Sequence, residues 1–296
     1  GNVIAPEDIL KKYGADILRI WVASSNYAED LRIDYSILDQ HSDSYRKIRN
    51  TFRYLLGNLN DKFEEIDLTK IDLEKLPELE RYILNKVYIL NNKFHNYFKS
   101  YDFHNLYKEL LNFCTVDLSA FYFDIRKDTL YCDNLNSVKR KSCVMVLNVL
   151  LNALLRWFAP ILSFTSEEIY QLISKENKSI HLKKFLSVPE KLNDDHILKK
   201  WNELIKIREV CNISIEEKRA TKEIGSSLEA ELKLNLNSKY KKILTNIDLS
   251  ELCIVSKAEI SFDEQSDIFV KTNKASGDKC PVCWKISVEP CARHPK

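Results

Sequence analysis

Helical periodicity limits the fold of this chain more than any other feature of its sequence. Apolar side chains recur at steps of three and four over residues 41–60, 79–99 and 103–124, which predicts amphipathic helices. Residues 138–158 are apolar almost all round, which indicates a helix buried at the centre of a bundle. The connections are short, so residues 41–174 are predicted to form an all-α bundle of five or six helices.

Two local signals follow the buried helix. Pro160 should stop it, and Thr165 with Glu168 reads as a capping box that begins the next helix, because each side chain can satisfy an orphan backbone N–H. Glu167 and Glu168 have no spaced acidic partner, so paired-carboxylate catalysis is not supported. No Gly-rich phosphate loop and no G-x-S-x-G motif occur in the sequence either.

The pattern changes beyond residue 174. Residues 175–196 are polar and contain Pro189, so we predict a linker. From Leu228 to Leu236 apolar and polar side chains alternate, as in a half-buried strand. The other predicted elements are a helix at 197–215, a helix at Lys239–Ile247, and short β-type runs at Leu252–Ser256 and Ile268–Thr272. Residues 197–275 are therefore predicted to form a small α+β domain.

Potential metal ligands are concentrated at the C-terminal end, in CPVCWKISVEPCARH. Cys280 and Cys283 can reach one metal from a single turn, and Cys291 with His294 can complete a tetrahedron. Four protein ligands leave no position for water, so we predict one structural Zn²⁺ per chain, in a module over residues 276–296. The alternative is a set of reduced surface thiols in a frayed tail. A redox role for the C-x-x-C pair is not favoured, because no βαβ context surrounds it.

Composition restricts the environment and the partners. Cysteines elsewhere in the chain, such as Cys114, Cys143 and Cys211, sit in apolar helical contexts, so nothing indicates an extracellular disulfide framework and we expect the reducing cytoplasm. No run of eighteen apolar residues occurs, and we predict no membrane span. The net charge is only +2, so a polyanionic partner would have to be held by local patches.

Two such patches are candidates for RNA binding. Arg46, Arg49 and Arg53 fall within about 60° of one another on a helix of 100° per residue, and guanidinium groups at this spacing suit a row of phosphates; an ordinary solvated basic face is the alternative. Trp284 is flanked by Lys279 and Lys285. Its indole could stack on a base, or it could simply pack against the zinc knuckle.

The N-terminal segment contains the most specific motif of the sequence. Pro6 and Gly14 bound one short predicted helix, and a second follows. This stretch resembles the segment just after the KMSKS loop of class I aminoacyl-tRNA synthetases, above all the isoleucyl-tRNA synthetases. The residues that match that segment are Tyr13, Gly14, Ala15, Asp16, Leu18, Arg19 and Trp21.

The resemblance extends over nearly the whole chain. It is dense through residue 170, in Tyr45–Leu59, Asn112–Tyr131 and Leu154–Tyr170, and it returns at Ile224–Leu232 and at the C-x-x-C-W of the Cys cluster. The family usually has a fourth Cys and a longer loop, whereas here the fourth ligand would be His294 or would lie beyond residue 296. The combination of DLSAFY with a terminal C-x-x-C-W favours the isoleucyl branch over the valyl and leucyl branches.

The resemblance implies a mainly α fold in which a helical-bundle anticodon-binding domain is followed by the small α+β domain and the zinc module. It implies a connector over residues 1–40, a tRNA-Ile partner held by the anticodon arm, and upstream catalytic and editing domains on the same polypeptide. The full-length enzyme would use ATP and Mg²⁺ to attach isoleucine to tRNA, whereas this part alone would be inactive. We expect a monomer. The alternative is a freestanding zinc-stapled helical RNA-binding or scaffold protein.

Overall fold

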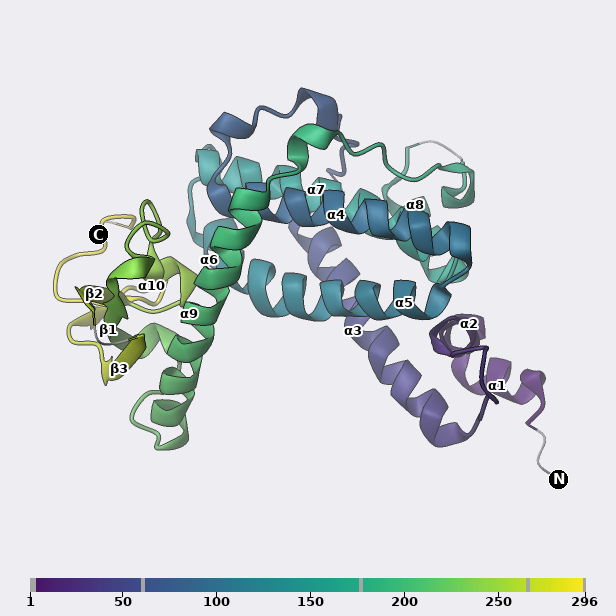
Figure 1. The fold of residues 1–296 in the computed structure, drawn as a ribbon, viewed down its shortest axis with the longest axis horizontal. Coiled ribbons are helices and arrows are strands. Elements are labelled where there is room, and N and C mark those ends of the chain that lie inside the picture. The colour runs from purple at the N-terminus through teal and green to yellow at the C-terminus, as the bar shows by residue number, and fades with distance from the viewer. Residues whose placement is uncertain (1–3, 60–61, 176–177, 265–266, 295–296) are drawn as a thin grey trace. The chain divides into compact units, whose positions relative to one another are not determined.

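The chain folds into two compact units in the computed structural model (Figure 1). The structure describes residues 4–59, 62–175, 178–264 and 267–294. Unit 1 contains residues 1–124 and 136–193, and unit 2 contains residues 125–135 and 194–296. The mainly helical architecture with a small sheet that the sequence predicted is confirmed.

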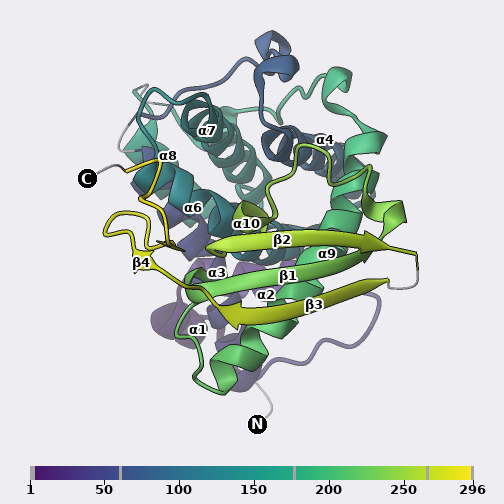
Figure 2. The same ribbon diagram turned by 90° about the vertical axis from the view of Figure 1, so that its left-hand side faces the viewer.

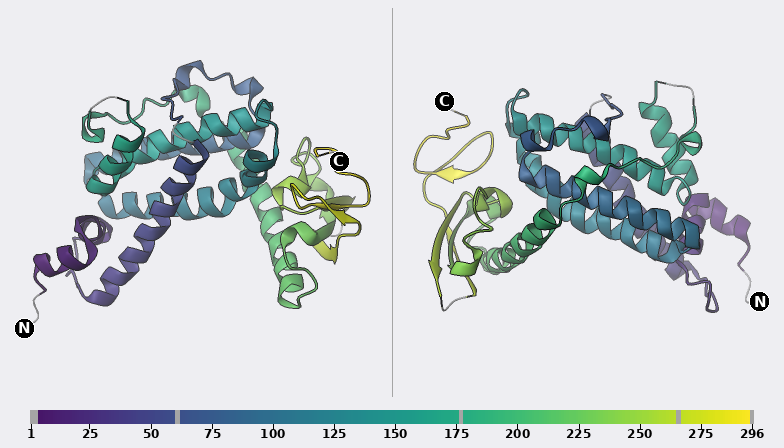
Figure 3. Two further views of the ribbon diagram at one scale, coloured as in Figure 1. Left: turned by 180° about the vertical axis from the view of Figure 1, so that it is seen from behind. Right: turned by 45° about the horizontal axis from the view of Figure 1, so that its top comes forward.

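Unit 1 is a helical bundle. Its central helices lie side by side (Figure 3), with α7 in contact with α3, α4 and α8. The helices of this unit are α1 (Pro6–Tyr13), α2 (Ala15–Ser24), α3 (Tyr35–Leu59), α4 (Glu78–Ser100), α5 (Phe103–Asn112), α7 (Val138–Phe158) and α8 (Ser163–Ile173).

Helix α7 forms the core of the bundle, as predicted. Its bounds match the predicted 138–158, and Trp157 and Phe158 are completely buried. Trp157 meets Phe94 and Phe113 edge-on, with ring centroids 5.0 and 6.1 Å apart, a favourable arrangement for aromatic quadrupoles. Among the described residues, α7 alone is long and apolar enough to cross a bilayer, but 78% of its apolar window is buried in the protein, as expected for a core helix.

Helix α3 begins earlier than the sequence pattern predicted. It begins at Tyr35 instead of residue 41, because Asp34 supplies a start signal: its Oδ1 accepts hydrogen bonds from the Ile37 N–H at 2.8 Å and the Ser36 hydroxyl at 2.7 Å. Most of the apolar positions that defined the predicted helix are buried, namely Ile48, Phe52, Leu55 and Leu59.

The helix predicted over residues 103–124 is part of a longer run. After α5, residues Phe113–Tyr122 form a π-helical stretch, and α6 (Phe123–Cys132) continues it. Within the stretch the Ser119 hydroxyl donates to the Cys114 carbonyl, five residues earlier, at 2.8 Å. The wider π turn offers carbonyls to side chains, a feature that period counting does not detect.

The corner between α7 and α8 is held by the N-terminal motif, and the predicted capping box is wrong. Helix α8 begins at Ser163, so Thr165 lies inside its first turn. The buried carboxylate of Asp16 caps the helix instead, because Oδ2 accepts from the Thr165 N–H at 2.8 Å and from its hydroxyl at 2.6 Å. Arg19 donates to the carbonyls of Pro160 and Ile161 at 2.7 and 2.8 Å. Orphan N–H groups at the start of α8 and two carbonyls of the turn that precedes it are thereby satisfied.

The predicted linker contains an ordered segment that packs on the bundle. It contains two 3₁₀ turns, Ile180–Leu182 and Glu190–Leu192, and buries Ile180 and Leu192. Between the turns, residues 183–187 cross the bundle in an extended conformation, and we call them the strap. Asn91 donates to the Leu186 carbonyl at 3.1 Å, so part of the strap backbone is fixed by a core residue.

Unit 2 contains a three-stranded sheet with order β2–β1–β3 (Figure 2). Strand β1 pairs in parallel with β2 and antiparallel with β3. Helix α9 packs against β3, and the alternate residues Ala230, Leu232, Leu234 and Leu236 of β1 are buried. Its elements are α6 from Ile125 onward, α9 (Asp195–Ala220), β1 (Ala230–Asn237), α10 (Leu249–Leu252), β2 (Lys257–Asp263), β3 (Ile268–Lys274), β4 (Asp278–Lys279) and β5 (Ile286–Ser287).

Two predicted elements of unit 2 are wrong. The helix predicted at Lys239–Ile247 is a 3₁₀ turn at Ser238–Tyr240 followed by turns. The β-type run predicted at Leu252–Ser256 ends helix α10 instead, because Asp248 caps that helix through the Ser250 N–H at 2.8 Å. The parallel strand β2 was missed, although Ala258, Ile260 and Phe262 alternate with polar residues in it.

Replacing Asp16 should destabilise unit 1 selectively. We expect Asp16→Ala to lower the free energy of unfolding by about 2 kcal/mol, because the N-terminal N–H groups of α8 lose a buried acceptor. Urea unfolding followed by circular dichroism at 222 nm measures this. Asp43→Ala is the matched control: its exposed pair with Arg46 should contribute no more than about 0.5 kcal/mol. Equal losses in both variants would rule out the carboxylate as the cap.

Candidate metal centre and nucleic-acid interface

A short hairpin positions the first two thiols of the Cys cluster. Strands β4 and β5 pair Lys279 with Ile286, and the turn between them is closed by two backbone bonds. The Cys280 N–H donates to the Lys285 carbonyl at 2.9 Å, and the Trp284 N–H donates to the Cys280 carbonyl at 3.0 Å. Trp284 adopts a left-handed backbone with φ of 63°, which turns the chain back. Both thiols therefore lie on the inner side of one tight knuckle.

The four predicted ligands come together in the structure. The donor atoms of Cys280, Cys283, Cys291 and His294 all lie within 4.8 Å of one another. The Cys283 and Cys291 sulfurs are 3.8 Å apart, and His294 Nδ1 lies 3.7 Å from Cys280 Sγ and 3.5 Å from Cys291 Sγ. A tetrahedral Zn²⁺ with ordinary bond lengths would separate its ligands by about 3.8 Å for S to S and about 3.6 Å for S to N. The donor set therefore fits zinc in element type and in spacing.

The tautomer of His294 suits a metal ligand. Its Nε2 lies 2.9 Å from the backbone carbonyl of Cys132. A carbonyl only accepts, so Nε2 carries the proton and the lone pair of Nδ1 points toward the thiols. A second partner that fixes the ring in this way is typical of metal-binding histidines.

The two knuckle thiols have different acidities. Backbone N–H groups of Cys283 and Val282 lower the pKa of Cys280 to about 6, because they stabilise its thiolate. Burial raises the pKa of Cys283 to about 11. Cys280 is therefore ready to bind a cation at neutral pH, whereas Cys283 would lose its proton on metal binding.

Arg293 fastens the cluster to helix α6 within unit 2. Its guanidinium donates to Asp128 at 2.6 Å and to Asp133 at 2.5 Å. These charge-assisted bonds lie next to the bond from His294 to Cys132. No local sequence pattern predicts these bonds, because Asp128 and Asp133 are more than 150 residues away along the chain.

An apolar pocket opens beside the knuckle. It has a volume of about 440 Å³ and is lined by α6 residues such as Ile125 and Tyr131, and by Val282 and Trp284. The Trp284 side chain is 59% exposed, and Lys279 Nζ lies 5.4 Å from its ring centroid, within cation–π range. Lys285 also lines this pocket. The structure therefore groups Lys279, Trp284 and Lys285 at one exposed site, and Tyr131 is a neighbour that sequence reasoning missed.

The three predicted arginines also share an exposed face. Arg46, Arg49 and Arg53 all project from α3 into solvent, opposite its buried apolar face. Arg46 is paired with Asp43 at 2.5 Å, so part of its charge is already balanced. These residues belong to unit 1, whereas the Cys cluster belongs to unit 2.

Comparisons with known proteins identify the family to which the chain belongs. The model for the anticodon-binding domain of tRNA ligase matches residues 80–234, which is more than half of the chain. The chain belongs to the anticodon-binding family of tRNA ligases. The model for class I tRNA synthetases (I, L, M and V) matches residues 1–34, the segment that contains Asp16 and Arg19.

Similar curated proteins are isoleucine–tRNA ligases. The ligase of Pelagibacter ubique is 70% identical over 99% of this chain and 32% of its own length. That of Zymomonas mobilis is 41% identical over 96% and 30%, and that of Agrobacterium fabrum is 38% identical over 98% and 31%. The chain spans about a third of the length of these relatives. The predicted resemblance to isoleucyl-tRNA synthetases is confirmed.

A solved structure shares the fold. The agnB2 LeuRS of Agrobacterium radiobacter K84, in a ternary complex with tRNA and LeuAMS, aligns with a TM-score of 0.51. The alignment covers 80% of this chain and 23% of the LeuRS chain, at 13% identity. At this identity the similarity concerns the fold alone.

A side chain at Gly277 should disrupt the knuckle. Gly277 has φ of 116°, and an added Cβ would lie 2.2 Å from the Ser287 carbonyl carbon. We expect Gly277→Ala to separate β4 from β5 and to speed exchange of the Cys280 amide at least about tenfold, since opening would become easier by more than about 1.4 kcal/mol. Hydrogen-exchange mass spectrometry of the knuckle peptide measures this. The control is Gly57→Ala, where a Cβ meets nothing within 4 Å; unchanged exchange in both variants would refute the close approach.

Proposed function

We propose that this chain is the tRNA-holding part of an isoleucine–tRNA ligase. It grips the anticodon arm of tRNA-Ile in the cytoplasm, while catalytic and editing domains of the same polypeptide attach isoleucine with ATP and Mg²⁺. The observation that carries this proposal is the 70% identity to an isoleucine–tRNA ligase over 99% of the chain. By itself, the 296-residue chain binds tRNA and does not aminoacylate it.

The segments have separate tasks in this proposal. Residues 1–40 connect the catalytic core to the bundle, and residues 41–174 form the anticodon-binding bundle. The bonds of Asp16 and Arg19 to the α7–α8 corner support a stiff connection at this point. Residues 175–196 link the bundle to the small domain at 197–275, which presents the zinc module at 276–296.

Affinity and base recognition come from different groups. Exposed Arg46, Arg49 and Arg53 contact phosphates, because guanidinium forks match phosphate oxygens. Trp284 stacks on an unpaired anticodon base at the apolar pocket, with Lys279 and Lys285 beside it. The exposure of the indole and the apolar lining of the pocket support this role, since single-stranded RNA is read largely through splayed, stacked bases.

Zinc has a structural role in this proposal. Cys280, Cys283, Cys291 and His294 bind one Zn²⁺, and no ligand position is left for substrate water. When bound, the ion supplies four strong cross-links to a module with few apolar side chains of its own. The residues around it do the rest: His294 and Arg293 hold the module on α6, and this positions Trp284 at the pocket.

The chain should discriminate between tRNAs. We expect tighter binding of tRNA-Ile than of tRNA-Val in fluorescence anisotropy at about 50 mM salt, with affinity that falls as salt rises because phosphate contacts release counterions. Equal affinity for the two tRNAs would contradict recognition of the anticodon. No binding of either would contradict the proposed function.

Replacing the three arginines of α3 together should flatten the salt dependence. In the same titration, Arg46→Gln, Arg49→Gln and Arg53→Gln combined should reduce the log–log salt slope by up to about three. The matched control replaces three exposed lysines of unit 1, Lys11, Lys62 and Lys108, by Gln, which removes the same charge elsewhere. An equal change of slope in the control would show that total charge, and not the position of the arginines, determines the salt dependence.

Metal removal should unfold the C-terminal module. We expect one zinc per chain by plasma mass spectrometry, and chelation should expose the module to exchange, because binding energy is folding energy at such sites. Cys283→Ser should lose the zinc. Cys132→Ser is the control, since this thiol lies beside the cluster without belonging to it. Zinc-free wild-type protein from zinc-supplemented expression would contradict the site.

A further inference from the structure

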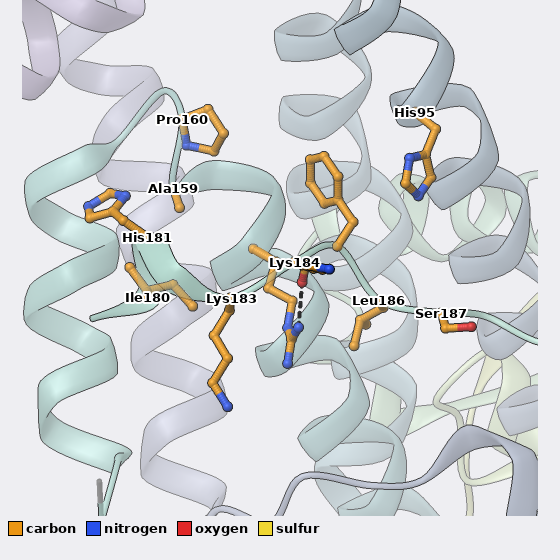
Figure 4. A pocket seen from close by; sticks show the side chains of 11 residues that line it. His95, Ala159, Pro160, Ile180, His181, Lys183, Lys184, Leu186 and Ser187 are labelled. Atoms are coloured by element: carbon orange, nitrogen blue, oxygen red, sulfur yellow. Dashed lines mark hydrogen bonds between the residues drawn. The ribbon is translucent and has the colours of Figure 1, made fainter. Parts of the chain in front are cut away.

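A second concave site lies in unit 1, between the end of α7 and the strap (Figure 4). Its volume is about 670 Å³, which is in the range of small-ligand pockets. In Figure 4, His181 and Pro160 lie on one side and His95 on the other, with Lys184 of the strap between them. Nothing in the role proposed for the zinc module uses this site, which we call the strap pocket.

One wall of the strap pocket is aromatic. Phe185 is half-buried and meets the His95 ring edge-on, with centroids 5.2 Å apart and an interplanar angle of 73°. Behind it, the Phe98 ring lies 4.9 Å away, and the exposed ring of Pro160 faces the same space. Flat, partly exposed rings of this kind are surfaces on which a nucleobase of any identity can stack.

The rim of the strap pocket is cationic. Arg156, Lys183 and Lys184 line it, and the only carboxylate paired with them among the described residues is Glu65, at 2.5 Å from Arg156 and 3.4 Å from Lys183. Lys184 is exposed and makes no ion pair with any residue that the structure describes. Positive charge therefore remains available for an anion beside an aromatic wall.

The strap is held rigidly before any ligand arrives. Arg156 donates to the Lys184 carbonyl, and its Nε donates to Asn152 at 2.9 Å. Asn91, which is buried, holds the Leu186 carbonyl and accepts from the Trp157 indole at 3.1 Å. Both neighbours of Phe185 are thus fixed to the core of the bundle. A preorganised site loses little entropy when it binds.

We propose that the strap pocket binds one nucleotide of an RNA chain, with the base against Phe185 and the phosphate at Lys184. An apolar ligand would leave the lysines unused, and a free anion would leave the aromatic wall unused, whereas a nucleoside phosphate uses both. This inference rests on the proposed tRNA-binding function. It adds a contact in unit 1 that is separate from the apolar pocket beside Trp284 in unit 2.

The test uses the 296-residue chain and anisotropy titrations with tRNA-Ile. Lys184→Gln should reduce the salt slope by about one, because one phosphate contact is lost. Phe185→Leu should weaken binding by roughly 5- to 150-fold, the range expected for one lost base–aromatic stack. Phe185→Tyr keeps the ring and should bind nearly as wild type, which separates stacking from a packing defect. Lys108→Gln, an exposed lysine outside both pockets, is the charge control.

The outcomes separate this inference from the function on which it rests. Failure of wild-type protein to bind any tRNA overturns the proposed function. Normal tRNA binding by wild type with unchanged affinity and salt slope in Lys184→Gln and Phe185→Leu overturns the strap pocket alone. Titration with AMP, followed by NMR shifts of the strap amides, identifies the source of the nucleotide: strap shifts with AMP together with unaffected tRNA binding by the variants would overturn the assignment to RNA.

Discussion

Burial of most of helix α7, from Ser142 to Phe158, is the constraint on which unit 1 depends. A helix with apolar side chains on every face is unfavourable in water, so other elements of the protein must cover it. The bundle supplies α3, α4 and α8 for this purpose. The packing of α7 also fixes the strap on the surface, because the Trp157 indole donates to Asn91, and Asn91 donates to the Leu186 carbonyl of the strap. The strap pocket is therefore a consequence of how the core is packed.

The C-terminal end of unit 2, in contrast, has few buried apolar side chains. The residues around the Cys cluster are mostly exposed, including Pro281, Val282 and Val288, and so few buried apolar groups cannot hold a fixed conformation. The Arg293 guanidinium between Asp128 and Asp133 anchors this end, and in the proposed function the Zn²⁺ held by the four donor atoms takes the place of a hydrophobic core. This replacement leaves Trp284 free to face solvent, since the indole is not needed for packing.

Elements that depend on their own periodicity could be predicted from the sequence, whereas elements set by distant partners could not. The bounds of α7, the burial alternation of β1 and the convergence of Cys280 and His294 all follow from local spacing. The capping of α8 does not, because Asp16 is 149 residues from Thr165 and outcompetes the local capping box. Helix α10 begins at a capping Asp248, and the edge strand β2 carries mostly exposed residues, so their apolar signals are weak.

The charge distribution explains why aromatic groups matter to the proposed RNA contacts. The net charge of +2 provides little long-range attraction for a polyanion, and two of the candidate cations are already paired with carboxylates: Arg46 with Asp43, and Lys183 with Glu65. Each charge that is shared with a carboxylate releases fewer counterions when it meets a phosphate. The contribution of stacking on Trp284 or Phe185 to affinity is not reduced in this way, because it depends on contact area and ring orientation. Both proposed contacts pair an aromatic face with a lysine, and this combination keeps affinity where the salt-dependent part alone would be weak.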